Sequence, residues 1–108
     1  LAETGRSLVS EFRKLLELHF REWHQVSDYA AELNITSDYL NNVMKSSVGS
    51  TAKDFIQSRI IIEAKRLGIH TDMSSKEIAY SLGFQDPAHF SNFFKKEEGI
   101  TFSEFRAG

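Results

Sequence analysis

The sequence contains no cysteine, only one proline and six glycines among its 108 residues. The absence of cysteine excludes a disulfide framework and a thiolate zinc site, and it is typical of a cytosolic protein. No apolar run is long enough to cross a bilayer and no secretory signal peptide is recognisable, so no membrane partner is expected. No alternation of apolar and polar residues recurs, so strands are not indicated either. We therefore predict an all-α protein in the cytoplasm.

The residues that are present supply enough apolar surface for a packed core. Hydrophobic residues make up 41 % of the chain and nine of them are phenylalanine, which excludes a disordered chain. The length suits one compact domain or two small subdomains that share a core. The net charge of −2 argues mildly against nucleic acid. However, residues 51–70 carry four basic and two acidic side chains, a local charge of +2 (4 minus 2), and local charge determines the field at a binding face.

The second half of the sequence repeats a pattern of the first half. The segment from Ala79 to Phe105 aligns with the segment from Ala30 to Phe55, with one inserted residue. Each copy predicts a short helix, a tight turn, and a longer helix that ends at glycine. Such a repeat is one supersecondary unit used twice, and its plan is that of a helix-turn-helix. The chain is therefore predicted to carry two DNA-binding motifs in tandem.

Apolar spacing and turn residues predict seven helices. Asn34 and Gly83 occupy equivalent turns, where both residue types tolerate a left-handed backbone. Thr36 is expected to cap the longer helix of the first motif and Asp86 that of the second. The helix after residue 51 is apolar around much of its circumference, including Ile62, so we expect it to lie between other elements. The expected helices cover about residues 7 to 23–25, 26–33, 37–48, 52–67, 75–82, 87–98 and 102–106. The resulting organisation is a linker stub at 1–6 and one domain at 7–108, with the first motif at about 26–48, a long central linker helix at about 52–67 and the second motif at about 75–98.

Short sequence elements in both motifs match a known pattern. In the second motif they are Ile78-Ala79, Gly83-Phe84, Asp86-Pro87, Phe90-Ser91, Phe94-Lys95-Lys96, Gly99, Thr101 and Phe105-Arg106; in the first they are Ala30-Ala31-Glu32-Leu33, Tyr39-Leu40 and Gly49. Together they resemble the AraC/XylS family of bacterial transcription regulators, over residues 8–106. The resemblance implies a seven-helix DNA-binding domain at the C-terminus of a larger regulator. Asn92 stands where the family often has Arg, so the resemblance does not imply which base is preferred at that position. Phe102 stands where Pro is common.

The longer helix of the first motif offers one set of candidate DNA contacts. Its residues Leu40, Val43 and Met44 are expected to face inward by their spacing. The polar residues that remain outward are Ser37, Asp38, Asn41, Asn42 and Lys45. Asn can pair with adenine through two hydrogen bonds, Ser and Lys can bind phosphate or base edges, and Asp can accept from cytosine N4. A merely solvated helix face is the alternative, but the tandem motif favours base recognition by Asn41 or Asn42.

The longer helix of the second motif offers another set. Phe90 and Phe94 are expected in the core, and the candidate contact residues are Ala88, His89, Asn92, Lys95 and Lys96. Ala88 suits a thymine methyl group, His89 or Asn92 a base edge, and the two lysines suit phosphate. The family resemblance places Asn42 and Asn92 at base-contacting positions. Whether this second helix enters the groove or rests on the backbone is left open. Phosphate is also expected at the starts of the second, fourth and fifth helices, because free N–H groups attract anions there.

Metal binding and catalysis are not expected. The four histidines share no short spacing and no cysteine accompanies them, which argues against zinc. No set of nucleophile, base and orienting residue is recognisable, and there is no glycine-rich phosphate loop. We therefore expect neither an enzyme nor a cofactor.

The expected partner is double-stranded DNA, bound by two recognition helices in successive major grooves about 34 Å apart. As part of an activator, the domain is expected to contact RNA polymerase as well. The chain starts at Leu1 rather than Met, so an upstream sensor or dimerisation region is expected to be absent from this fragment. The alternative is a helical protein-interaction module that contacts polymerase or a sensor domain through its first and sixth helices. A third possibility is a domain that keeps the fold but is too acidic to bind DNA alone.

Overall fold

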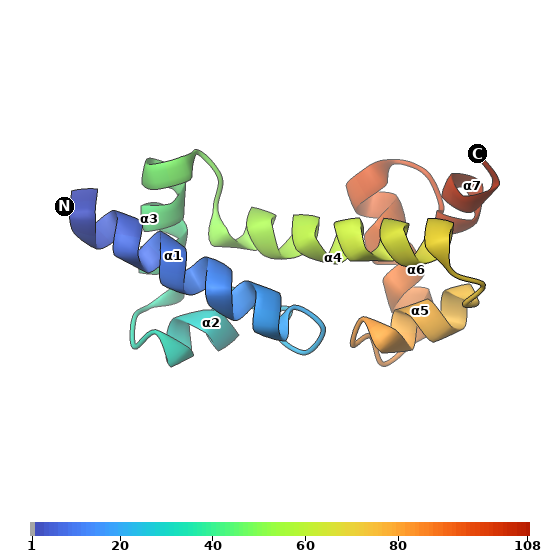
Figure 1. Ribbon diagram of the computed structural model, residues 1–108, viewed down its shortest axis with the longest axis horizontal. Coiled ribbons are helices and arrows are strands. Elements are labelled where there is room, and N and C mark those ends of the chain that lie inside the picture. Colours follow the sequence, from blue (N-terminus) through green and yellow to red (C-terminus); the bar gives the residue numbers. More distant parts are fainter. Residues whose placement is uncertain (1) are drawn as a thin grey trace. The chain divides into compact units, whose positions relative to one another are not determined.

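The computed structural model describes residues 2–108, with side chains described from residue 5 onward. Within these residues the chain forms seven α-helices and no strand, which confirms the all-α prediction (Figure 1). The helices are α1 (Ala2–His19), α2 (Val26–Glu32), α3 (Ser37–Val48), α4 (Ala52–His70), α5 (Ser75–Ser81), α6 (Pro87–Glu98) and α7 (Phe102–Ala107). They form two compact units, the first ending at Ser58 and the second beginning at Arg59, so the boundary falls inside α4.

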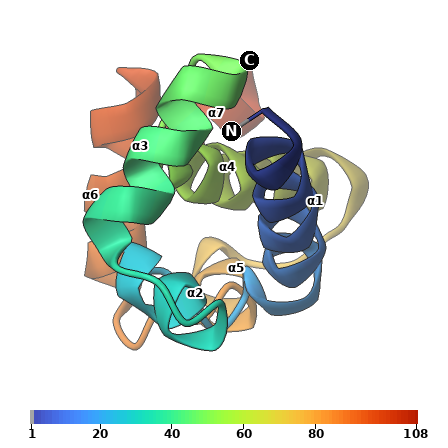
Figure 2. The same ribbon diagram turned by 90° about the vertical axis from the view of Figure 1, so that its left-hand side faces the viewer.

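In the first unit, α1 and α2 both pack against α3 (Figure 2). The core between them includes Phe12, Tyr29, Leu40 and Met44, each fully buried. The Phe12 and Tyr29 rings meet edge to face at 5.3 Å. The Tyr29 hydroxyl donates a hydrogen bond of 2.9 Å to the carbonyl of Trp23, and burial raises the pKa of this phenol. These contacts fix the position of α2 against α3.

In the second unit, four phenylalanine side chains are part of the core. The centroid of the Phe102 ring lies 5.2 Å from that of Phe90 and 5.1 Å from that of Phe94, both in edge-to-face contact. The ring centroids of Phe84 and Phe90 are 5.4 Å apart. Aromatic rings bury a large apolar area each, and this geometry adds roughly 0.5–1.5 kcal/mol per pair. A few short helices can therefore support α6 with a small core.

The first helix does not have the ends that we predicted. It begins at Ala2, ahead of the predicted start at Ser7, so residues 2–6 are helical and not an irregular stub, while Leu1 lies outside the described residues. Gly5 lies inside this helix next to α3, where an added Cβ would lie 3.0 Å from Ser47 Oγ. The helix also ends at His19, before the predicted end near residues 23–25. The Trp23 carbonyl is instead used by the Tyr29 hydroxyl. The domain limits themselves stay predictions.

The long helix α4 also differs from its prediction. It continues to His70, past the predicted end at residue 67. Gly68 does not stop the helix but makes room for α7, because a Cβ at this position would lie 2.8 Å from the Phe102 ring. Ile62, which was expected to be buried, is 59 % exposed. Three consecutive residues span too much of a helix to share one face, so Ile60 and Ile61 are buried and Ile62 is not.

Candidate nucleic-acid interface

In the first unit, local features orient α3 as sequence reasoning expects. Asn34 adopts the left-handed backbone with φ 58° in the turn before the helix. The Thr36 hydroxyl caps α3 by accepting a hydrogen bond of 3.0 Å from the Tyr39 N–H. Leu40 and Met44 are buried, whereas Val43 is only half-buried. The remaining side chains of α3 are half-buried or exposed.

The five predicted contact residues of α3 do not share one environment. Asp38, Asn42 and Lys45 are exposed, and their spacing of four and three residues places them on one face. Ser37 and Asn41 are half-buried at the margin of that face. The Asn41 side-chain carbonyl accepts a hydrogen bond of 3.2 Å from the Lys53 N–H at the start of α4. Asn41 therefore supports the junction with α4, and Asn42 is the amide on the open face.

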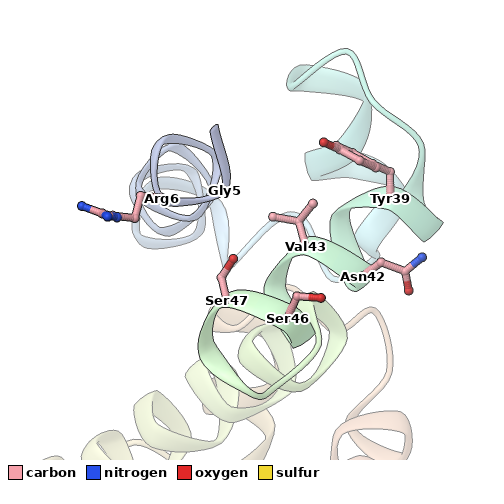
Figure 3. Close-up of a pocket in the computed structure, with 7 residues that line it drawn as sticks. All are labelled: Gly5, Arg6, Tyr39, Asn42, Val43, Ser46 and Ser47. Carbon is pink, nitrogen blue, oxygen red and sulfur yellow. The ribbon is translucent and has the colours of Figure 1, made fainter. Parts of the chain in front are cut away.

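Two further residues belong to this surface, and sequence reasoning missed them. Tyr39 is 48 % exposed and Ser46 is exposed. Figure 3 shows Tyr39 and Val43 beside the space between α1 and α3, with Asn42 and Ser46 near them on the same helix. The spacing of three and four residues between Tyr39, Asn42 and Ser46 was a usable signal.

The second unit presents α6 in a similar way. Gly83 adopts φ 87° in the turn, and Asp86 caps the helix by accepting a hydrogen bond of 2.8 Å from the Ala88 N–H. Phe90 and Phe94 are buried. All five predicted contact residues are exposed: Ala88, His89, Asn92, Lys95 and Lys96. Phe93 is half-buried, with its ring 5.5 Å from Phe84, at the margin of this surface.

Two hollows flank α3, and residues of the first unit line both. One has a volume of about 550 Å³ and lies on the α1 side (Figure 3). Its lining residues are Gly5, Arg6, Tyr39, Asn42, Val43, Ser46 and Ser47. The other has a volume of about 480 Å³ and lies where α2, α3 and α4 begin. Its lining residues are His24, Gln25, Val26, Ser27, Ser37, Lys53 and Gln57.

The helix starts that were expected to bind phosphate carry carboxylates of their own. Asp28 accepts from the backbone N–H of Gln25 before α2, and Asp54 accepts from that of Thr51 before α4. Before α5, Glu77 accepts from the Ser74 N–H at 2.9 Å. This bond, and a second one with the Ser74 side chain, hold the pKa of Glu77 below its ordinary value. A fixed negative charge at each start weakens the attraction for phosphate.

Both motifs match known proteins. The family model described as a helix-turn-helix domain matches residues 29–108, which include most of α2 and all later helices. The chain belongs to the AraC-type helix-turn-helix family.

Relatives of this AraC-type domain include whole regulators. The uncharacterized HTH-type transcriptional regulator YisR of Bacillus subtilis is 32 % identical over 96 residues, covering 89 % of this chain and 33 % of that protein. The HTH-type transcriptional activator RhaS of Enterobacter sp. is 31 % identical over 109 residues, covering 98 % of this chain and 38 % of that protein. The chain thus spans between 33 % and 38 % of the length of these two relatives.

A solved structure supports the same assignment. The DNA-binding domain of AdpA, in complex with a target DNA, is 25 % identical to this chain with a TM-score of 0.77. The match covers 93 % of this chain and 89 % of that chain.

Ion pairs determine which basic groups of the AraC-type domain remain available. In the second unit, the Arg66 guanidinium donates to both carboxylate oxygens of the buried Glu63 at 2.9 and 2.7 Å, and Arg59 lies 3.8 Å from the same carboxylate. Lys65 pairs with Glu98 of α6. Of the four bases in residues 51–70, only Lys53 makes no ion pair with any described residue.

The described residues contain neither a metal-binding cluster nor a membrane-spanning helix. In the part of the chain that the structure describes, no three His, Cys, Asp or Glu side chains gather in a way that could hold a metal ion. Within the same residues, none of the helices has the length and apolar character that crossing a bilayer requires.

Proposed function

We propose that this chain binds double-stranded DNA sequence-specifically through α3 and α6, as the DNA-binding part of a bacterial transcription regulator. One observation carries the proposal: each unit presents the second helix of a helix-turn-helix with an exposed asparagine at the equivalent position of the repeat, Asn42 and Asn92. The DNA-bound AdpA domain supports it through a shared fold and 25 % identity.

In the first unit we assign base recognition to Asn42. Its amide is exposed and can form two hydrogen bonds with the N6 and N7 atoms of adenine. Asp38, on the same face, is suited to accept from cytosine N4, and Lys45 and Ser37 are suited to phosphate or base edges. The Asn41 carbonyl already accepts a hydrogen bond from α4, so this amide is less free to turn toward a base than that of Asn42.

In the second unit we assign phosphate binding to Lys95 and Lys96 of α6. Lys95 and Lys96 add two positive charges to its exposed surface, and none of the other three candidate residues is acidic. In α3, the charges of Asp38 and Lys45 cancel. The two lysines are suited to phosphate, which is bound regardless of sequence, although Glu97 and Glu98 balance their charge at the end of α6. Ala88, His89 and Asn92 remain the candidates for base contacts if α6 enters the groove.

The wider setting is part of the proposal. We propose that the two recognition helices occupy successive major grooves, and that the longer regulator has an upstream sensor or dimerisation region. The relatives that are about three times as long support such a region. We also propose that the regulator contacts RNA polymerase, acts in the bacterial cytoplasm and catalyses no reaction. Its similarity to RhaS, a transcriptional activator, supports these proposals.

Selection of bound sequences from a random duplex pool tests this function. The fragment is expected to enrich a defined motif at low salt, with weak binding to random DNA of about 10⁻⁴ to 10⁻⁶ M at physiological salt. Asn42→Ala should cost roughly 1–3 kcal/mol on the enriched site and relax the preference at one base position. Ser10→Ala, on the exposed surface of α1, is the matched control and should change neither the affinity for the enriched site nor the base preference. If no duplex binds at low salt, the proposal is wrong.

One observation favours a protein-interaction function as a second candidate. Leu18 on α1 is 72 % exposed, and the other exposed side chains of α1 from residue 5 onward are polar. An apolar contact there should persist at high salt, whereas DNA binding should weaken steeply. A partner that is retained in high salt and lost in Leu18→Ser would support this second function.

A further inference from the structure

The hollow where α2, α3 and α4 begin has the side chains of an anion site. All of its lining residues except Val26 carry polar side chains. They include one ammonium group, Lys53, together with the hydroxyls of Ser27 and Ser37 and the amide of Gln57. No carboxylate lines it. Such a set offers several hydrogen-bond donors and a full positive charge to one ligand.

Three N–H groups at these helix starts already have partners. The Lys53 N–H is bonded to Asn41, the Asp54 N–H to the Thr51 hydroxyl at 3.2 Å, and the Tyr39 N–H to the Thr36 hydroxyl. The lining side chains are therefore the main donors that the hollow offers to a ligand. The Lys53 ammonium is the group most available to it, since it makes no ion pair with any described residue.

The position of the hollow beside α3 identifies the ligand. A helix with its side chains is about 10–12 Å across and a major groove is about 12 Å wide, so the flanks of a bound helix face the two sugar-phosphate backbones. Ser37, in the first turn of α3, lines the hollow on one of these flanks. Because the charges of Asp38 and Lys45 cancel on the exposed face of α3, a lysine at a flank adds to the attraction for the backbone.

We propose that this hollow binds a backbone phosphate of the duplex that α3 recognises, with Lys53 supplying the charge. The inference rests on the proposed function and assigns one of its anchoring contacts. The repeat supports it: the position of Lys53 is occupied by Ser103 in the second unit, which carries its positive charges on α6 itself as Lys95 and Lys96. The two units thus obtain phosphate attraction from different elements.

The test compares two variants that remove the same charge from the first unit. Lys53→Gln should lower the slope of log Kobs against log salt by about 0.9, which separates it from the wild type by about 3.5-fold over a fourfold salt increase. Lys14→Gln is the control, because Lys14 lies on α1, pairs with Glu11 at 3.9 Å and lines neither hollow. It should leave the slope unchanged. Lys53→Arg should retain the wild-type slope, and all variants should enrich the wild-type motif.

Single neutral methylphosphonate substitutions then locate the contact on the selected duplex. The wild type should lose affinity at one phosphate beside the α3 site, and Lys53→Gln should be insensitive at that phosphate alone. Equal sensitivity of both proteins at every phosphate would overturn the inference while leaving DNA binding intact. A slope that falls in Arg6→Gln but not in Lys53→Gln would also overturn it, because the contact would then lie at the opposite flank. Failure of the wild type to bind any duplex would instead overturn the proposed function.

Discussion

Replacing Gly68 by alanine tests the close approach of α7 to α4. The added Cβ would lie 2.8 Å from Cζ and 3.3 Å from Cε1 of Phe102, and real Cβ atoms essentially never come within 3.0 Å of a neighbour. The Phe102 ring cannot easily move aside, because Phe90 and Phe94 contact it at 5.2 and 5.1 Å. The substitution therefore overpacks the core of the second unit.

Two opposing effects determine the magnitude. Alanine is favoured over glycine inside a helix by about 1 kcal/mol. Overpacking a well-packed core costs about 1–3 kcal/mol. Gly5→Ala in α1 is the matched control, because its Cβ would meet only the Ser47 hydroxyl at 3.0 Å, which can rotate away. The free energy of unfolding of Gly68→Ala should therefore lie about 1–3 kcal/mol below that of Gly5→Ala.

Urea unfolding followed by circular dichroism measures both variants. The slopes with denaturant should agree, so that the midpoints report stability. In a double variant, Phe102→Leu should relieve part of the cost of Gly68→Ala, because neighbouring residues do not act additively. If Gly68→Ala proves as stable as Gly5→Ala, then α7 does not approach α4 as closely as the structure shows.

Three further substitutions test α6 and the cap of α5. Lys95→Ala should weaken binding similarly on every sequence and lower the salt slope by about one unit, as measured by fluorescence anisotropy; a sequence-dependent loss would contradict its assignment to phosphate. For Asn92→Ala the same assay separates two positions of α6, since a loss of base preference places the helix in the groove and a uniform loss places it on the backbone. Because the pKa of Glu77 is lowered in the folded chain, its stabilising effect is present above the ordinary glutamate pKa of about 4.3 and is lost as the pH falls through the lowered value. Glu77→Gln should therefore flatten the decline of the thermal midpoint in acid, and an unchanged decline would show that this cap does not contribute.

Local chemistry explains the features that were predicted correctly. The Thr36 and Asp86 caps and the left-handed turns at Asn34 and Gly83 depend on residues a few positions apart. A cap needs only a short side chain next to a free N–H, and a left-handed turn needs only a residue that tolerates positive φ. Helix boundaries with such signals, including both ends of α3 and α6, were therefore predicted accurately.

Contacts between distant residues explain the errors. Gly68 was expected to end α4, but a glycine inside a helix also allows another element to approach, and only the position of Phe102 distinguishes the two roles. The early end of α1 at His19 has no local breaker; it accompanies the hydrogen bond from Tyr29 to the Trp23 carbonyl. Neither contact is visible in the spacing of apolar residues.

The sequence by itself determined the two helix-turn-helix motifs, their equivalent positions and their family, because periodicity, caps and repeats act within a few turns of helix. Only the tertiary structure decided the roles of neighbouring polar residues. Asn41 and Asn42 are adjacent and identical in type, yet the start of α4 engages the first and leaves the second exposed. Likewise Lys53 is available while Lys65 pairs with Glu98. A side chain's role depends on which groups surround it, and those groups come from elements that are distant in the chain.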